Sequence, residues 1–176
     1  MRPFNTILFL LLTTLISCNT KGKPSPEAKI YRANSIQKIV DNLGEGNIIG
    51  DNIGIAGSTY RFELFKQLNK IATTSELITL TDHENPAVRY YSFRALASRR
   101  NDKVFEILLN HMNDTMQVVS FSGCTGMTET LRYNLINIVR SDETNLNGYK
   151  LSEKQAAIID SILQKNPDPI YRPISN

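Results

Sequence analysis

Cysteine and histidine are the residues of this sequence best suited to direct chemistry, and the 176-residue chain has only two of each. Cys124 lies between two glycines, which would let a substrate approach a nucleophilic thiol, and His111 could serve as its base. A lone cysteine of this kind is more often a small, inert side chain in the core. We therefore expect Cys124 to be buried, and a thiol-dependent enzyme or factor that uses Cys124 and His111 stays as an alternative.

Carboxylates lie beside both histidines, in Asp82-His83-Glu84 and at Asp114 close to His111. A zinc site needs several His, Cys or carboxylate ligands at characteristic spacings. Neither histidine has a second His or Cys at such a spacing. We expect these side chains to be solvated residues of helix turns, and we predict neither a metal site nor a cofactor.

Glycines are concentrated in one stretch, where Gly44, Gly46, Gly50, Gly54 and Gly57 are five of the nine in the chain. Such a loop could cradle a phosphate or another small ligand. The dinucleotide-binding fingerprint, however, requires a strand before the glycines, and this stretch follows a predicted helix. We expect these glycines to form turns, and a small-ligand binder that uses the Gly44–Gly57 loop is kept as a second alternative.

Arginine and tyrosine gather in and just after one predicted helix. These two residue types are favoured at protein interfaces. A solvated helix face is the competing interpretation. The residues that we expect to form a binding face for a protein or peptide partner are Arg89, Tyr90, Tyr91, Arg94, Arg99 and Arg100.

Helical periodicity runs through most of the chain that must position these side chains. Apolar residues recur at i, i+3, i+4 and i+7, and several segments open on capping residues, such as Asn85-Pro86 and the Ser152/Gln155 capping box. No segment alternates convincingly as a strand, so we predict an all-α domain of about six or seven helices. The helices are expected near residues 35–43, 58–72, 76–81, 86–98, 101–112, 128–140 and 152–165.

One helix pair has a pattern of its own. The stretch from Leu77 to Ala97 has an apolar first helix, Asp82 at the turn, then Pro86, Val88-Arg89 and small residues on the second helix. This pattern resembles a HEAT repeat, with weaker echoes in 58–73 and 101–119. The resemblance implies a short α-α superhelix of HEAT or armadillo type over residues 34–166, with Asp82 and Arg89 paired across the turn. An irregular helical bundle with one HEAT-like hairpin is the competing interpretation.

The N-terminus has the features of an export signal. Arg2 precedes an apolar run, residues 7–16, which is too short to span a bilayer. The next residues, Leu15-Ile16-Ser17-Cys18, resemble the lipobox of bacterial lipoproteins. That resemblance implies cleavage after residue 17, lipidation of Cys18 and a lipid bilayer as a partner. An ordinary signal peptide followed by a chance cysteine is the alternative.

Residues 18–33 are predicted to be a lipidated cysteine and a flexible tether, because charge, glycine and proline leave little to bury. Residues 167–176, rich in proline, are predicted to be an extended tail. In lipoproteins of Gram-negative bacteria, an Asp after the lipidated cysteine often marks retention in the inner membrane. Asn19 stands there instead, so the resemblance implies the outer membrane, with the domain facing the periplasm.

Composition narrows the classes of function. Twenty basic and seventeen acidic residues give a formal charge of +3 without a basic block, which argues against nucleic acid as a partner. With Cys18 lipidated, Cys124 would be the one free thiol, and no internal disulfide could form. The sequence therefore predicts a membrane-anchored periplasmic lipoprotein whose helical repeats act as a non-catalytic protein-interaction or scaffold module.

Overall fold

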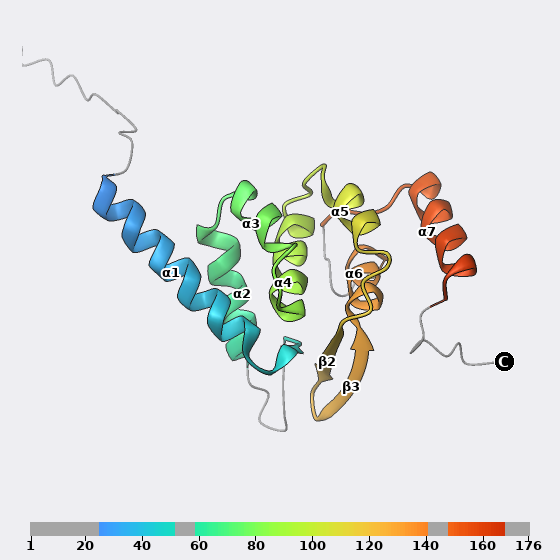
Figure 1. The fold of residues 1–176 in the computed structure, drawn as a ribbon, viewed down its shortest axis with the longest axis horizontal. Helices are drawn as coiled ribbons and strands as arrows, with labels where there is room; N and C mark the ends of the chain where they lie inside the picture. Colours follow the sequence, from blue (N-terminus) through green and yellow to red (C-terminus); the bar gives the residue numbers. More distant parts are fainter. Residues whose placement is uncertain (1–24, 52–58, 141–147, 168–176) are drawn as a thin grey trace, which may run out of the picture.

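The computed structural model describes residues 25–51, 59–140 and 148–167. This part of the chain is mostly helical, and a small three-stranded sheet lies beside the helices (Figure 1). The expected number of helices is confirmed, but the prediction of an all-α domain is wrong because of the sheet. The helices are α1 Pro26–Gly44, α2 Tyr60–Ile71, α3 Thr74–Leu80, α4 Pro86–Ser98, α5 Val104–Asn110, α6 Leu131–Arg140 and α7 Glu153–Lys165. A 3₁₀ turn, Glu45–Asn47, leads into β1 Ile48–Ile49, and β2 Gln117–Ser122 and β3 Thr125–Thr130 form a hairpin.

Helix α1 begins well before the residue where we expected it. Ser25 caps the helix by accepting a hydrogen bond from the backbone N–H of Ala28, and Pro26 occupies the first turn. The buried residues of α1 all lie after Ser35, so the apolar periodicity of the sequence reveals only that half of the helix. The expectation of an extended tether as far as residue 33 is therefore wrong from Pro26 onward.

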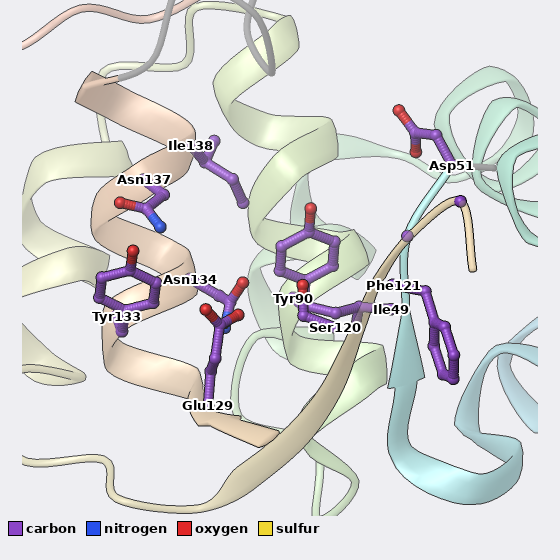
Figure 2. A pocket seen from close by; sticks show the side chains of 12 residues that line it. Ile49, Asp51, Tyr90, Ser120, Phe121, Glu129, Tyr133, Asn134, Asn137 and Ile138 are labelled. Atoms are coloured by element: carbon purple, nitrogen blue, oxygen red, sulfur yellow. The ribbon is translucent and has the colours of Figure 1, made fainter. Parts of the chain in front are cut away.

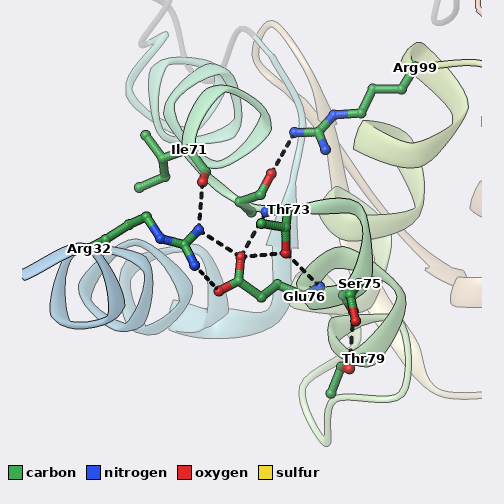
Figure 3. Close-up of polar contacts among 8 residues, drawn as sticks. Arg32, Ile71, Thr73, Ser75, Glu76, Thr79 and Arg99 are labelled. Atoms are coloured by element: carbon green, nitrogen blue, oxygen red, sulfur yellow. Dashed lines mark hydrogen bonds and ion pairs between the residues drawn. The ribbon is translucent and has the colours of Figure 1, made fainter. Parts of the chain in front are cut away.

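The pair α3 and α4 matches the HEAT-like segment of the sequence, and its two ends are well capped. Thr73 and Glu76 form a capping box at the start of α3, and Asn85 with Pro86 opens α4 as predicted. Arg32 of α1 makes a bidentate contact to Glu76, with N–O distances of 2.9 and 2.7 Å (Figure 3). Its hydrogen bonds hold the pKa of the Glu76 carboxyl below the usual range. One carboxylate thus caps α3 and ties it to α1.

Helix α4 lies at the centre of the fold. It packs against α1, α2, α3, α5, α6 and the sheet, and residues on all of its sides are buried. A helix that is buried all round needs apolar or neutralised side chains on every face. The Arg and Tyr side chains of α4 therefore do not all face solvent.

The hairpin of β2 and β3 is inserted between α5 and α6. Phe121 pairs with Gly126 and Ser122 with Thr125 across it, so Gly123 and Cys124 form a two-residue turn in which Gly123 has φ 59°. This is the position at which hairpin turns favour glycine. Strand β1 runs parallel to β2 on the other side, with Ile48 opposite Val119. The sheet order is therefore β1-β2-β3.

The predicted helix over residues 128–140 is wrong at its start, because residues 128–130 belong to β3. The hydroxyl of Thr130 accepts a hydrogen bond from the backbone N–H of Tyr133, 3.2 Å away, and so caps α6. The echo of the HEAT pattern in 101–119 is likewise wrong in its second half. Val118 lies in a strand, and the helix that follows α5 is α6.

Helix α7 begins with the predicted Ser152/Gln155 capping box. Within the described ranges, no helix combines the length and apolarity that a membrane span requires. The predicted signal peptide (1–17), Cys18 and the tail after residue 167 lie outside the described residues.

Candidate functional site

Three of the six residues expected to form a partner-binding face are in the core. Tyr90, Tyr91 and Arg94 are 6%, 0% and 7% exposed. The hydroxyl of Tyr91 donates to the carbonyl oxygen of Gly50 and accepts from its N–H, both at 3.2 Å, which ties α4 to the segment after β1. The expected exposed face is therefore wrong for these residues, because α4 is surrounded by other elements.

Arg94 is neutralised inside the protein. Its guanidinium makes a bidentate contact to the carboxylate of Asp51, one N–O distance being 2.6 Å, and it lies 4.6 Å from the centre of the Phe65 ring. Burial alone would lower the pKa of Arg94, but the hydrogen bonds to Asp51, together with electrostatic interactions with Asp51, Tyr90 and Tyr91, outweigh it, and the pKa lies above its usual value. Arg94 is therefore a structural cation that fixes Asp51 against α4.

Arg89 and Arg99 also form hydrogen bonds with other residues of the chain. Arg89 contacts the carbonyl oxygen of His83 and the carboxylate of Asp114, the latter at 2.5 Å. The expected pair of Arg89 with Asp82 is wrong, because Asp114 from the segment after α5 takes that place. Arg99 donates to Asn69 and to the carbonyl oxygen of Ala72, each at 2.9 Å.

Arg100 is the exposed member of the expected set. It follows the end of α4 with φ 53°, a left-handed conformation that is uncommon for a residue with a side chain. The structure therefore does not bring the six residues together on one accessible surface.

His111 lies in a polar cluster at the end of α5. Its Nδ1 is 3.3 Å from a carboxylate oxygen of Asp114, and its Nε2 is 3.6 Å from Asp82, whose side chain is 79% exposed. Burial would raise the pKa of Asp114, but His111, the backbone N–H of Met116 and Arg89 outweigh it and lower the pKa. No group of three potential metal ligands exists among the described residues. Through the contact between Arg89 and Asp114, this polar cluster links α4 to the segment after α5.

Cys124 is exposed at the turn of the hairpin, so the expectation of a buried thiol is wrong. His111 precedes the other end of the hairpin, where the backbone N–H of Leu131 bonds to Met116. Six-residue strands at about 3.4 Å per residue place the turn roughly 20 Å from that end. The structure therefore does not bring His111 to Cys124, and no thiol–base pair is formed.

A pocket of about 380 Å³ lies between the sheet, α4 and α6 (Figure 2). Its walls come from four separate segments of the chain: Ile49 to Asp51, Tyr90 of α4, the β2–β3 hairpin, and residues 133–138 of α6. Its volume falls in the usual range of small-molecule sites, and polar groups are interspersed with apolar ones. We regard it as the candidate functional site.

Tyr90 lies in the middle of this pocket, between α6 and the segment after β1 (Figure 2). Its ring packs edge-on against Tyr91, with ring centres 5.0 Å apart. No described residue exchanges a hydrogen bond with its hydroxyl, although the side chain is almost fully buried. Burial raises the pKa of Tyr90 above its usual range, so the hydroxyl stays protonated at neutral pH.

Glu129 of β3 contributes a carboxylate to the wall of the pocket. It accepts a hydrogen bond from the side-chain amide of Asn134 at 3.2 Å, and no described basic residue pairs with it. The second carboxylate, on Asp51, is neutralised by Arg94. The described lining residues include no Lys, Arg or His, so the pocket carries an uncompensated negative charge.

The sequence pointed to only part of this pocket. Gly50 and Asp51 belong to the predicted glycine-rich loop, and the sequence predicts Tyr90 as part of a partner-binding face. Gly54 and Gly57 lie outside the described residues. Glu129 of β3 and the lining residues of α6, such as Asn134, carry no local pattern that marks a site. The one sequence signal of the α6 residues is a set of polar positions on an amphipathic helix.

A second depression, of about 490 Å³, lies along α1 and α2. Lys38 and Lys70 contribute basic groups from the two helices, and the described lining residues include no carboxylate. Tyr60, at the start of α2, is 56% exposed, and Ile30 and Tyr31 are exposed nearer the start of α1. We call this depression the α1–α2 groove; it is more accessible than the predicted face on α4.

Comparisons with protein families, curated proteins and solved structures give no match to this chain. The class that the structure itself defines is a mostly helical domain with a small three-stranded sheet.

Proposed function

We propose that this chain is an exported bacterial lipoprotein, anchored through Cys18 and held at the periplasmic face of the outer membrane. The observation that supports the anchor is the sequence Leu15-Ile16-Ser17-Cys18, placed directly after an apolar run of leader length. Because α1 begins at Pro26, only residues 19–25 separate the anchor from the first helix. At about 3.5 Å per residue, these residues span at most roughly 25 Å.

The anchor is tested by Cys18→Ser. The substituted chain should leave the membrane fraction and lose incorporation of labelled fatty acid, while Cys124→Ser, which removes the other cysteine, should change neither. Acylation that persists in Cys18→Ser, or that disappears in Cys124→Ser, would contradict the assignment.

The anchored domain acts as a non-catalytic interaction module, built from helix pairs of the HEAT-like kind seen in α3 and α4. Two features support this role over catalysis. Cys124 is at the turn of the hairpin, whereas His111 precedes its other end and contacts Asp114. A short α-α superhelix would extend this pairing from α1 to α6, with the β-hairpin as an insertion.

The partner surface that the geometry favours is the α1–α2 groove, and its occupant is an acidic segment of another protein. Lys38 and Lys70 line this groove without an ion-pair partner among the described residues. Leu64, Ile71 and the exposed Tyr60 also line the groove and give it an apolar and aromatic surface. Aromatic anchors beside unpaired charges are the usual composition of an interface that binds a charged peptide.

The groove is tested by placing a photo-crosslinking residue at Gln67 and irradiating the cells from which the protein comes. A crosslinked protein counts as a partner only if it disappears in the double variant Lys38→Glu/Lys70→Glu and persists in Lys154→Glu, a charge reversal on exposed α7. Crosslinks that survive the double variant, or a partner segment without acidic residues, would overturn the assignment of this surface.

A further inference from the structure

Beyond the proposed interaction role, the pocket between the sheet, α4 and α6 has the features of a ligand site. We propose that it binds a small organic cation that carries a primary ammonium group. The proposal rests on the walls of the pocket: a tyrosine more than nine-tenths buried whose hydroxyl has no partner among the described residues, a carboxylate without a basic partner, and no described cationic side chain. It does not depend on the anchor at Cys18 or on the α1–α2 groove.

The charges of the pocket decide the class of ligand. Asp51 and Glu129 both line the pocket, and Arg94 neutralises the first of them. An anionic ligand would meet the negative charge of Glu129 without a basic side chain to offset it. A ligand cation would instead form a charge-assisted hydrogen bond with this carboxylate, in a partly enclosed space where such bonds are stronger than in water.

Tyr90 supports the same class of ligand. Its side chain is more than nine-tenths buried, yet its hydroxyl has no partner among the described residues and is accessible from the pocket, so it is available to a ligand. The Tyr90 hydroxyl can accept a hydrogen bond from an ammonium group, and the faces of tyrosine rings attract cations. The side-chain amide of Asn134 donates a hydrogen bond to the Glu129 carboxylate, so this carboxylate is already oriented before a ligand binds.

The test uses the full chain, purified in detergent, and three four-carbon probes of matched length. They are 1,4-diaminobutane, 1,4-butanediol and succinate, which carry ammonium, hydroxyl and carboxylate groups at their ends. Binding is measured by isothermal titration calorimetry. We expect the diamine to bind and the diol and succinate to bind at least tenfold more weakly. Equal binding of the diol or succinate, or no binding of the diamine at millimolar concentration, would overturn the proposal.

Three variants separate binding from folding. Glu129→Gln keeps the acceptor for Asn134 but removes the charge, and it should weaken diamine binding about tenfold or more. Tyr90→Phe should weaken it about three- to tenfold without lowering the melting temperature, because the hydroxyl has no partner to lose. Ser92→Ala is the matched control, since it removes another unpartnered hydroxyl of α4 that is fully buried and does not line the pocket.

The pattern across the variants decides the outcome. Weakened binding in Glu129→Gln and Tyr90→Phe, with unchanged binding in Ser92→Ala, supports the site. A lower melting temperature in Tyr90→Phe would show that its hydroxyl has a structural role and would contradict the proposal. Unchanged affinity in Glu129→Gln would also contradict it.

Discussion

The contact between Arg94 and Asp51 offers the sharpest test of the fold, because it joins the centre of α4 to the segment after β1. The Arg94 side chain is 9% exposed, whereas that of Asp51 is 43% exposed. Removing the charge of Asp51 leaves a buried guanidinium without its counter-ion. Breaking a fully buried ion pair in this way costs about 3–5 kcal/mol, while exposed pairs contribute about 0–1 kcal/mol.

Because Asp51 is partly solvated, we discount the buried value and expect Asp51→Asn to lower the free energy of unfolding by about 2 kcal/mol. For a domain of this size, that corresponds to a fall of roughly 6 °C in melting temperature. The matched control is Asp160→Asn, which breaks the exposed pair of Arg140 and Asp160 and should cost less than about 1 kcal/mol. Urea unfolding followed by circular dichroism, on Cys18→Ser chains free of lipid, measures both.

A second substitution distinguishes charge from packing. Arg94 also lies over the Phe65 ring, at 4.6 Å from its centre. Methionine has similar reach and packs well against aromatic rings, so Arg94→Met placed in the Asp51→Asn chain should restore at least about half of the lost stability. Equal losses in Asp51→Asn and Asp160→Asn, or no recovery on adding Arg94→Met, would refute the reasoning that an uncompensated buried charge is the cause.

Three further predictions concern single positions. Gly50 has φ 139°, and a Cβ there would lie 2.6 Å from the carbonyl oxygen of Phe121, so Gly50→Ala should cost about 1–3 kcal/mol in urea unfolding. Because the pKa of Asp114 is lowered in the folded state, its contribution to stability is present above about pH 4 and is lost as the pH falls through the folded pKa. Asp114→Asn should therefore be less stable at pH 7 and lose less stability on acidification, and an acid limb equal to that of the natural chain would contradict this. Cys124 is exposed, so a small maleimide should label one thiol per chain under native conditions and no more after unfolding if Cys18 is lipidated.

The sequence predicted the helices best where capping chemistry and periodicity agree. Asn85-Pro86 marks the start of α4, and Ser152 with Gln155 marks the start of α7. Both signals are local, since a cap depends on residues within one turn. The first half of α1 was missed for the opposite reason: it is exposed, so only Ser25-Pro26 marks its start, and there is no apolar stripe to follow.

The sheet could be predicted only in part. Val118-Val119-Ser120-Phe121 has strand-forming residues, and Gly123-Cys124 has the length and glycine of a hairpin turn. The apparent repeat spacing suggested a helix there instead. The pairing of Ile48 with Val119 could not be predicted, because nothing local relates two residues so distant in the chain.

The exposure of Arg and Tyr residues was the least predictable property. Tyr90, Tyr91 and Arg94 have the composition of an interface, but that composition also suits a central helix whose arginine is neutralised by a distant carboxylate. Whether such a side chain faces solvent depends on which elements cover it. Here the covering elements include the sheet, which the helical interpretation left out.

The position of the candidate site also follows from the sheet that the helical prediction left out. In a plain helix pair, α6 would follow α5 after a short turn, and α4 and α6 would be neighbours with no sheet at their side. The inserted hairpin places Glu129 beside α6 and brings β2 next to Ile49 and Gly50, and this arrangement closes the pocket around Tyr90. Polar groups that a helical core would exclude, a hydroxyl without a partner among the described residues and a carboxylate without a basic partner, occur at this place. Departures from local regularity that also carry unsatisfied polar groups are expected where function opposes stability. We therefore expect a chain with an altered hairpin to lose ligand binding in this pocket, even though its helices α3 and α4 stay folded.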